Sequence, residues 1–183
     1  MTNSRVITPD EFGQVIHDFE HTAFRLELQD SYLEAEEAEI FEAFLRGEPE
    51  PPTVVPGLRE WYRRIAEHVA QGKRIERVRV QQDPPTDYQR FERWMGHWNQ
   101  QAGETMRYLT RARAFDIGLL PAAGNTDWWL YDSSRLLAMH FDDEGHRISN
   151  ELITDPEVVI QACKWRDLAV HHSALASNQD AAA

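Results

Sequence analysis

The sequence predicts an α/β (α+β) fold: a mixed sheet with flanking helices, completed by a C-terminal antiparallel meander and a closing helix. Alternation of apolar and polar residues is typical of strands, and apolar residues at every third or fourth position are typical of helices. The two patterns interleave along the chain, most clearly in a strand-helix-strand segment over residues 73–111. We expect one domain over residues 1–172 and a small, polar, disordered tail over residues 173–183.

The N-terminal part is expected to contain two helices with a strand between them. A capping-box pattern at residues 8–11 predicts a first helix that runs to about His17. Residues 23–28 alternate as a half-buried strand does, and from Tyr32 onward the apolar spacing becomes helical. A proline cluster over residues 49–56 then predicts an extended linker.

The central part shows the clearest strand pattern of the chain. A helix over residues 58–71 precedes a strand over residues 74–80, in which the Glu76-Arg77 pair breaks strict alternation and suggests a bulge or a strand end. A helix over residues 87–101 and a short strand over residues 106–110 follow. The segment is therefore expected to form two neighbouring strands joined by a helix.

The C-terminal part predicts the meander and the closing helix. Three short strand patterns, over residues 127–132, 136–141 and 148–153, are separated by turn residues. Asp155 is expected to cap a last helix over residues 156–170.

Composition restricts the class of function. The formal net charge is −12, with 31 acidic and 19 basic side chains, and this field opposes direct binding of nucleic acid. The single cysteine, Cys163, cannot form an internal disulfide, and the N-terminal residues do not resemble a signal peptide, so a cytoplasmic location is expected. No apolar run approaches the roughly 18 residues of a membrane span. An acidic block at residues 34–50 and a basic block at residues 59–79 make a homodimer an open expectation.

The candidate site is a group of charged and aromatic side chains around the central segment. Arg77 and Arg79 share one strand face, and Tyr88 and Glu92 lie one helical turn apart. Two interpretations stay open: a buried ion-pair network, which charged groups at element ends favour, or a pocket whose guanidiniums hold a carboxylate, a phosphate or a zwitterion. The predicted ligand-binding residues are Arg77, Arg79, Tyr88, Glu92, Glu104, Arg107, Trp128 and Asp132.

Motifs for cofactors, metals and covalent catalysis are weak. The glycines are scattered and form neither a P-loop nor a dinucleotide fingerprint, so no cofactor is predicted. His17 and His21 have the spacing of two zinc ligands on a helix, but Asp18 stands where the peptidase motif requires glutamate, and no metal site is predicted. Cys163 is expected to pack as a small apolar side chain, and no catalytic residue is assigned.

The order of several sequence stretches resembles the actinomycete family known as domain of unknown function 6879. The resemblance covers about residues 23–174 and rests on FRLELQDSY, EIFEAFLRGEP, RVRV with PPTDYQRFE, AGETMRYL, DWWLYDSSRLLAMHFDDEG and KWRDLAV. It implies a companion of helix-turn-helix regulators encoded in the same gene neighbourhoods. The resemblance implies no catalytic residues.

A more distant likeness concerns topology. The order of elements is similar to half of a phospholipase D-type domain, whose catalytic pattern requires a histidine and a lysine two residues apart before an aspartate. Residues 124–131, which precede Asp132, contain neither. The likeness implies a non-catalytic relative.

Two functions remain as hypotheses. The first is a non-enzymatic regulatory or signalling protein that acts with a partner such as a helix-turn-helix regulator and binds a small anionic effector. The second is a small-molecule biosynthetic enzyme that has an arginine-lined pocket and uses a tyrosine, glutamate or histidine as acid or base.

Overall fold

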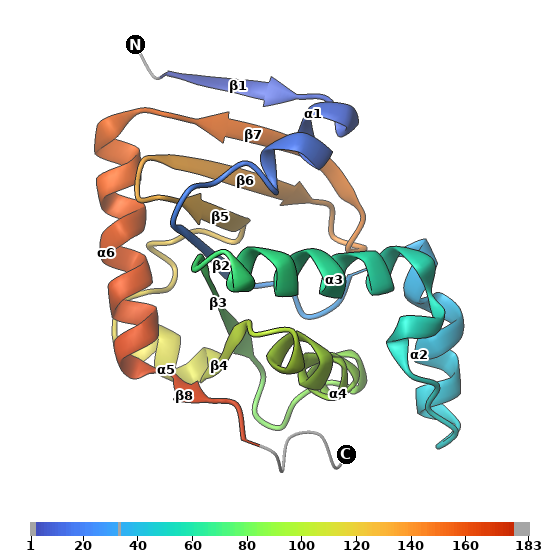
Figure 1. Ribbon diagram of the computed structural model, residues 1–183. Coiled ribbons are helices and arrows are strands. Elements are labelled where there is room, and N and C mark those ends of the chain that lie inside the picture. The colour runs from blue at the N-terminus through green and yellow to red at the C-terminus, as the bar shows by residue number, and fades with distance from the viewer. Residues whose placement is uncertain (1–2, 33, 178–183) are drawn as a thin grey trace.

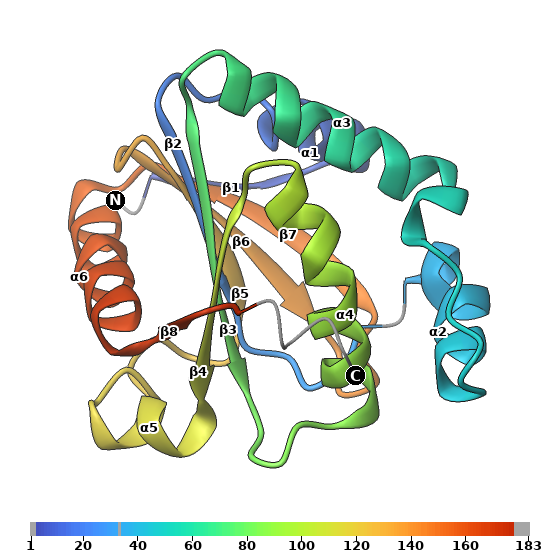
Figure 2. The ribbon, with the colours of Figure 1, turned by 60° about the horizontal axis from the view of Figure 1, so that its bottom comes forward.

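The computed structural model describes residues 3–32 and 34–177, and these form an eight-stranded mixed sheet with helices on both faces. The strand order is β1-β7-β6-β5-β2-β3-β4-β8. Figure 2 shows α5 and α6 on one face of the sheet and α1, α3 and α4 on the other. The predicted α/β class is confirmed.

The centre of the sheet is parallel. β2 (Thr22–Glu27) pairs with β3 (Arg74–Gln81), and β3 pairs with β4 (Thr105–Thr110). The chain passes from β2 to β3 through α2 (Ala38–Leu45) and α3 (Pro56–Ala70), and from β3 to β4 through α4 (Asp87–Gln101). The expected strand-helix-strand segment is therefore a parallel pair with its connecting helix.

The other side of the sheet is antiparallel. β5 (Asp127–Tyr131), β6 (Arg135–Phe141) and β7 (Arg147–Ile153) form the predicted meander, and β5 joins it to β2. β1 (Ser4–Ile7) pairs with β7 at the edge, as Figure 1 shows. The sequence did not indicate β1, because an exposed edge strand of four residues has almost no apolar pattern.

Local capping explains where the helices begin. Thr8 starts α1 (Pro9–Val15) and Thr86 starts α4, each within a complete capping box. Asp155 accepts backbone hydrogen bonds at the start of α6 (Pro156–His172). A short helix that the sequence did not indicate, α5 (Arg111–Asp116), follows β4 with Thr110 as its cap.

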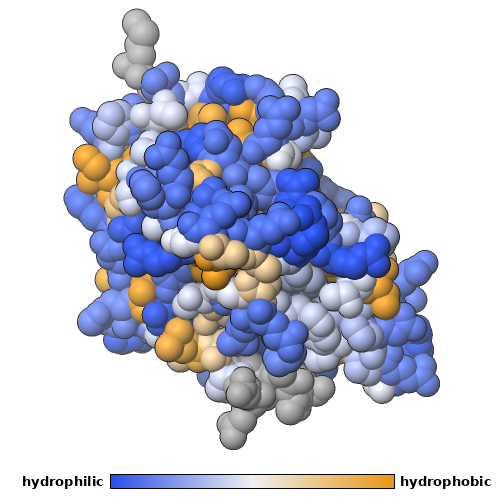
Figure 3. Space-filling view, viewed as in Figure 1, coloured by the Kyte–Doolittle hydropathy of each residue, from blue (hydrophilic) through white to orange (hydrophobic). Residues whose placement is uncertain are grey.

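Apolar cores lie on both faces of the sheet. On the α5–α6 side, Leu26, Val78 and Leu130 belong to one core; on the other side, Ile75 and Trp129 belong to a second core under α1 and α3. A third core joins α2 to α4 through aromatic side chains. The face shown in Figure 3 is mainly hydrophilic, with apolar residues in small, separate patches. Within the described ranges, no helix combines the length and the apolar character needed to cross a bilayer.

Three expectations about local structure were wrong. Residues 35–37 form a 3₁₀ turn before α2, so no continuous helix starts at Tyr32; Leu33 lies outside the described residues. The proline segment contains a 3₁₀ turn at Pro52–Val54 and then starts α3 at Pro56. β3 pairs with both neighbours through the Glu76-Arg77 pair, without a bulge or a strand end. Strict alternation of apolar and polar residues is absent there because both faces of this central strand are covered.

The C-terminal tail is partly ordered. β8 (Ala174–Leu175) pairs with Tyr108 and Arg107 of β4, which contradicts the expectation of disorder over that part. Backbone hydrogen bonds to an open sheet edge order these residues although their side chains are small. Residues 178–183, where the expectation also applied, lie outside the described residues.

Candidate functional site

The centre of the sheet carries charged side chains on a face that helices cover. Arg25 and Glu27 project from β2, and Arg77 and Arg79 project from β3 in register beside them. We call these four residues the polar floor. Residues two apart on a strand share a face, so regular alternation places all four under α3 and α4. Their side chains are 4–17% exposed.

Glu27 contacts all three arginines of the polar floor. Its Oε1 lies 2.8 Å from Nη1 of Arg77, which donates a hydrogen bond, and 3.1 Å from Nε of Arg25. Its Oε2 accepts a hydrogen bond of 2.5 Å from Nε of Arg79. Charge-assisted contacts of this kind are needed to keep ionised groups inside a protein.

The remaining guanidinium contacts reach a second set of partners. Arg77 also donates through Nε to Oε1 of Glu104 at 2.8 Å, and Asn99 donates to the other oxygen of that carboxylate. Arg79 donates through Nη1 to the backbone carbonyl of Glu92 at 2.6 Å. Arg77 and Arg79 therefore each donate hydrogen bonds to two residues of the protein.

Asp127 anchors the far end of the floor at β5. It lies 3.6 Å from Nη2 of Arg25 and accepts a hydrogen bond of 2.5 Å from the hydroxyl of Tyr32. The backbone N–H of Leu28 donates to its other oxygen. These contacts fix the chain as it leaves β2 towards α2.

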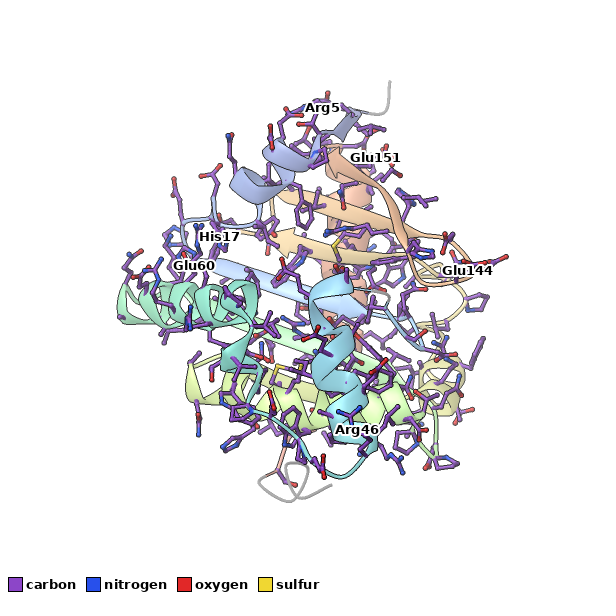
Figure 4. The ribbon with its side chains drawn as sticks, turned by 90° about the vertical axis from the view of Figure 1, so that its right-hand side faces the viewer. Arg5, His17, Arg46, Glu60, Glu144 and Glu151 are labelled. Atoms are coloured by element: carbon purple, nitrogen blue, oxygen red, sulfur yellow. The ribbon has the colours of Figure 1, made fainter. Side chains whose placement is uncertain are left out.

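A cavity of about 420 Å³ lies over the polar floor. Its walls come from α1, α3, α4 and residues 34–37, which lead into the α2 helix seen in the foreground of Figure 4. Volumes of this order are typical of small-molecule sites. Besides the floor, the lining includes Tyr32, Glu34, Glu36, Glu37, Trp61, Tyr62, Tyr88, Glu92, Met95, Trp129, Phe141 and Arg147.

The electrostatic surroundings divide the carboxyl groups into two kinds. Burial alone would raise the pKa of Glu27, but Arg25, Arg77 and Arg79 outweigh it and hold that pKa below the usual value. Burial raises the pKa of Glu92 to about 8, because the nearby guanidiniums of Arg79 and Arg77 do not compensate for burial and for the carboxylates of Glu27 and Glu37. Glu92 is thus mainly uncharged at neutral pH.

The structure brings together five of the eight predicted site residues. Arg77, Arg79, Tyr88 and Glu92 line the cavity. Glu104 lies behind it, bound to Arg77. The hydroxyl of Tyr88 donates to Glu37 at 2.9 Å. The two open interpretations of the sequence therefore describe neighbouring parts of one arrangement: an ion-pair network forms the floor of a pocket.

The other three predicted residues lie elsewhere. Arg107 alternates onto the opposite face of the sheet and pairs with Glu76. Trp128 packs with Phe24 in the core under α6, while its neighbour Trp129 lines the cavity, because successive strand residues face opposite sides. Placing Trp128 rather than Trp129 at the site was therefore wrong.

Asp132 has a structural role in the turn after β5. With φ at 51°, it accepts hydrogen bonds from the backbone N–H groups of Glu20, His21 and Thr22, at 2.7–2.8 Å. Burial raises the pKa of the Asp132 carboxyl, but these three hydrogen bonds lower it by more, so the pKa lies below its usual value. Its carboxylate fixes the start of β2 and is not part of the cavity lining.

Several important residues were not predicted as part of the site, although β2 carried a signal. Arg25 and Glu27 alternate with apolar residues in the stretch FRLEL, and this pattern was interpreted as a strand with one solvated face. The polar face is covered because α3 and α4 pack above it, which depends on contacts remote in sequence. The opposite charges of Arg25 and Glu27 on one strand face are the sequence signal that indicates a paired, covered face.

His17 and His21 lie in different surroundings. His17 stacks with His68 at 5.8 Å, and burial, with Arg64 and His68 nearby, lowers the pKa of His17 to about 4. His21 is exposed beside Glu20. Over residues 3–32 and 34–177, no group of three or more His, Cys, Asp or Glu side chains has an arrangement that would hold a metal ion.

Comparison with known families identifies the group of proteins to which this chain is related. The model for the family described as Domain of unknown function (DUF6879) matches residues 10–177. The chain belongs to this family. No curated protein matches the sequence.

Solved structures show how the DUF6879 fold relates to others. A phospholipase D family member, Nuc from Salmonella typhimurium, has 7% identity and a TM-score of 0.52, with 96% of this chain and 98% of that chain covered. NucT from Helicobacter pylori has 9% identity and a TM-score of 0.51, with the same coverage of each chain. The phospholipase D-like topology suggested by the sequence is confirmed as a likeness of fold.

We predict that Glu27→Gln lowers the free energy of unfolding by about 3–5 kcal/mol, because it leaves buried guanidiniums without their shared counter-charge. Urea unfolding followed by tryptophan fluorescence measures this change. Glu60→Gln is the matched control, since Glu60 also bonds two arginines, Arg63 and Arg64, but is 44% exposed on α3, and it should cost little. Equal losses for the two variants would contradict the role of Glu27.

We also predict a pH-dependent effect of Glu92→Gln. The pKa of Glu92 is about 8 in the folded protein against a usual 4.5, so the folded state binds the extra proton between these values. This carboxyl therefore makes the wild type less stable as pH rises from about 5 to 8, by up to about 1.4 kcal/mol per pH unit. Urea unfolding at several pH values should show the variant gaining stability relative to wild type with rising pH. A constant difference would exclude the assignment.

Proposed function

We propose that this chain is a non-enzymatic, cytoplasmic regulatory protein that binds a small molecule in the central cavity and acts with a partner such as a helix-turn-helix regulator. The observation that supports it best is the cavity of about 420 Å³ above an ion-paired floor. The pairing of Arg25, Arg77 and Arg79 with carboxylates gives a rigid base on which a ligand can be oriented. The partner is proposed from the resemblance to companions of such regulators.

The pairing of the three arginines with Glu27 disfavours a simple anionic effector. A carboxylate or phosphate ligand would have to compete with Glu27, which already contacts three guanidiniums. The cavity walls add further carboxyl groups at Glu34, Glu36 and Glu37. Like charges repel, so the geometry favours a ligand that is not an anion.

Residues 34–37 offer a route from the cavity to the surface. They line the cavity and continue into α2, which contacts α4 through Phe41, Phe44 and their aromatic neighbours. A ligand that contacts residues 34–37 would favour one position of α2 over others. The acidic outer side of α2, with Glu39 and Glu42 exposed, would then present the change to a partner protein.

An enzyme is the second candidate, favoured by Glu92. A buried carboxyl with a pKa of about 8 in a cavity can take up and release protons near neutral pH. Tyr88 stands one helical turn away and also lines the cavity. Among the described lining residues there is no histidine, so acid-base chemistry would depend on carboxyl and phenol groups such as these two.

A blocked cavity should abolish binding. We expect a small molecule from a cell extract to raise the melting temperature of the wild type by about 5–10 °C when it is present at a hundred times its dissociation constant. Ala35→Trp, which adds a large side chain at a position in the cavity lining, should remove the effect. Ala38→Trp is the matched control, because Ala38 is exposed like Ala35 but lies outside the lining, and it should retain the effect.

The bound molecule also separates the two candidates. Mass spectrometry should recover it unchanged if the chain is a receptor, whereas conversion would identify an enzyme. Association with a helix-turn-helix regulator should be measured for wild type, Ala35→Trp and Ala38→Trp. The bound molecule should change this association for wild type and Ala38→Trp, and should have no effect on it for Ala35→Trp. Absence of any stabilising molecule would contradict a ligand-binding role.

A further inference from the structure

The buried charges around the polar floor do not balance. Three guanidiniums, from Arg25, Arg77 and Arg79, face four carboxyl groups, from Glu27, Glu92, Glu104 and Asp127. The cation nearest to the Glu92 carboxyl is Arg79, with Oε1 3.5 Å from Nη2, and Arg79 also pairs with Glu27. One carboxyl group therefore faces the cavity without a cation of its own.

The cavity wall adds carboxyl groups that also lack basic partners. In the described part of the chain, no ion pair joins Glu34, Glu36 or Glu37 to a basic side chain. Arg147, the one basic lining residue outside the floor, is exposed and stacks on Phe12 at 4.4 Å. Glu37 is bound to the hydroxyl of Tyr88, and Glu92 lies one helical turn from Tyr88. The two carboxyl groups thus flank one tyrosine at the cavity wall.

Aromatic side chains supply the rest of the recognition surface. Trp61, Tyr62 and Tyr88 line the cavity, and rings of this kind bind organic cations as well as apolar groups. Trp129 also lines it, is 1% exposed, and has an indole N–H with no hydrogen-bond partner among the residues described. The aromatic part of the lining therefore suits an organic cation.

We propose that the cavity binds a small organic amine, with its ammonium group at Glu37 and Glu92. This inference rests on the proposed receptor function and names its ligand class. A metal ion fits less well, because the described residues form no metal-binding group. The aromatic walls match an organic molecule of similar size to the cavity.

The proposal has a consequence for protons. Burial and the neighbouring carboxylates keep the Glu92 carboxyl protonated at neutral pH, and an ammonium group beside it would favour the ionised form. Binding of the amine should therefore release protons from the protein at pH 7. Calorimetric titration in buffers of different ionisation enthalpy measures the number released.

Three matched probes test the ligand class by isothermal titration calorimetry: 2-phenylethylamine, 2-phenylethanol and 3-phenylpropionate. We expect the amine to bind the wild type at least about tenfold more tightly than the alcohol, and the carboxylate to bind most weakly. Glu37→Gln should remove most of this preference while it leaves the alcohol unaffected. Ala35→Trp should abolish binding of the amine, and Ala38→Trp should not.

Charge-separated cell extract distinguishes failure of this inference from failure of the receptor proposal. The fraction retained by a cation-exchange resin should contain the molecule that stabilises the wild type. Stabilisation by an anionic or neutral fraction alone, equal binding of the three probes, or an unchanged preference in Glu37→Gln would overturn the amine assignment. Stabilisation by no fraction would overturn the receptor proposal, and this inference with it.

Discussion

The contact of Glu27 with three arginines determines how the centre of this protein is built. Guanidiniums from two adjacent parallel strands would repel one another, and their burial would be very costly, without the carboxylate between them. With it, β2 and β3 can present charged side chains on a covered face. The helices above this face pack around a cavity, whereas the opposite face is closed by an apolar core. The polar floor and the cavity are therefore parts of the same arrangement.

The DUF6879 chain is similar in fold to a phospholipase D family member. Its likeness to Nuc and NucT extends over nearly the whole of each chain, but the identities of 7% and 9% support a common fold and nothing more about chemistry. The chemistry available here comes from the floor and the cavity walls. Paired charges form the floor, aromatic rings contribute to the walls, and Glu92 shares its nearest guanidinium, Arg79, with Glu27.

Local features were predictable from the sequence, and remote contacts were not. The capping box at Thr8, the shared face of Arg77 and Arg79 and the meander depend on neighbouring residues, and the structure confirms them. The covered face of β2 depends on helices that follow it in the chain, so Glu27 was not recognised as part of the site. Choosing Trp128 over Trp129 required knowledge of which sheet face contains the cavity, which alternation alone does not specify.

The most direct test is a carbon-13 NMR titration of the glutamate side-chain carboxyl groups between about pH 4 and 9, assigned with Glu27→Gln and Glu92→Gln. Because the arginines outweigh the effect of burial on Glu27, its signal should stay at the position of an ionised carboxylate throughout. The signal of Glu92 should move near pH 8. Titration of Glu92 at the usual value of about 4.5, or of Glu27 within the range, would contradict a floor in which Glu27 neutralises the arginines and leaves Glu92 without a full counter-charge.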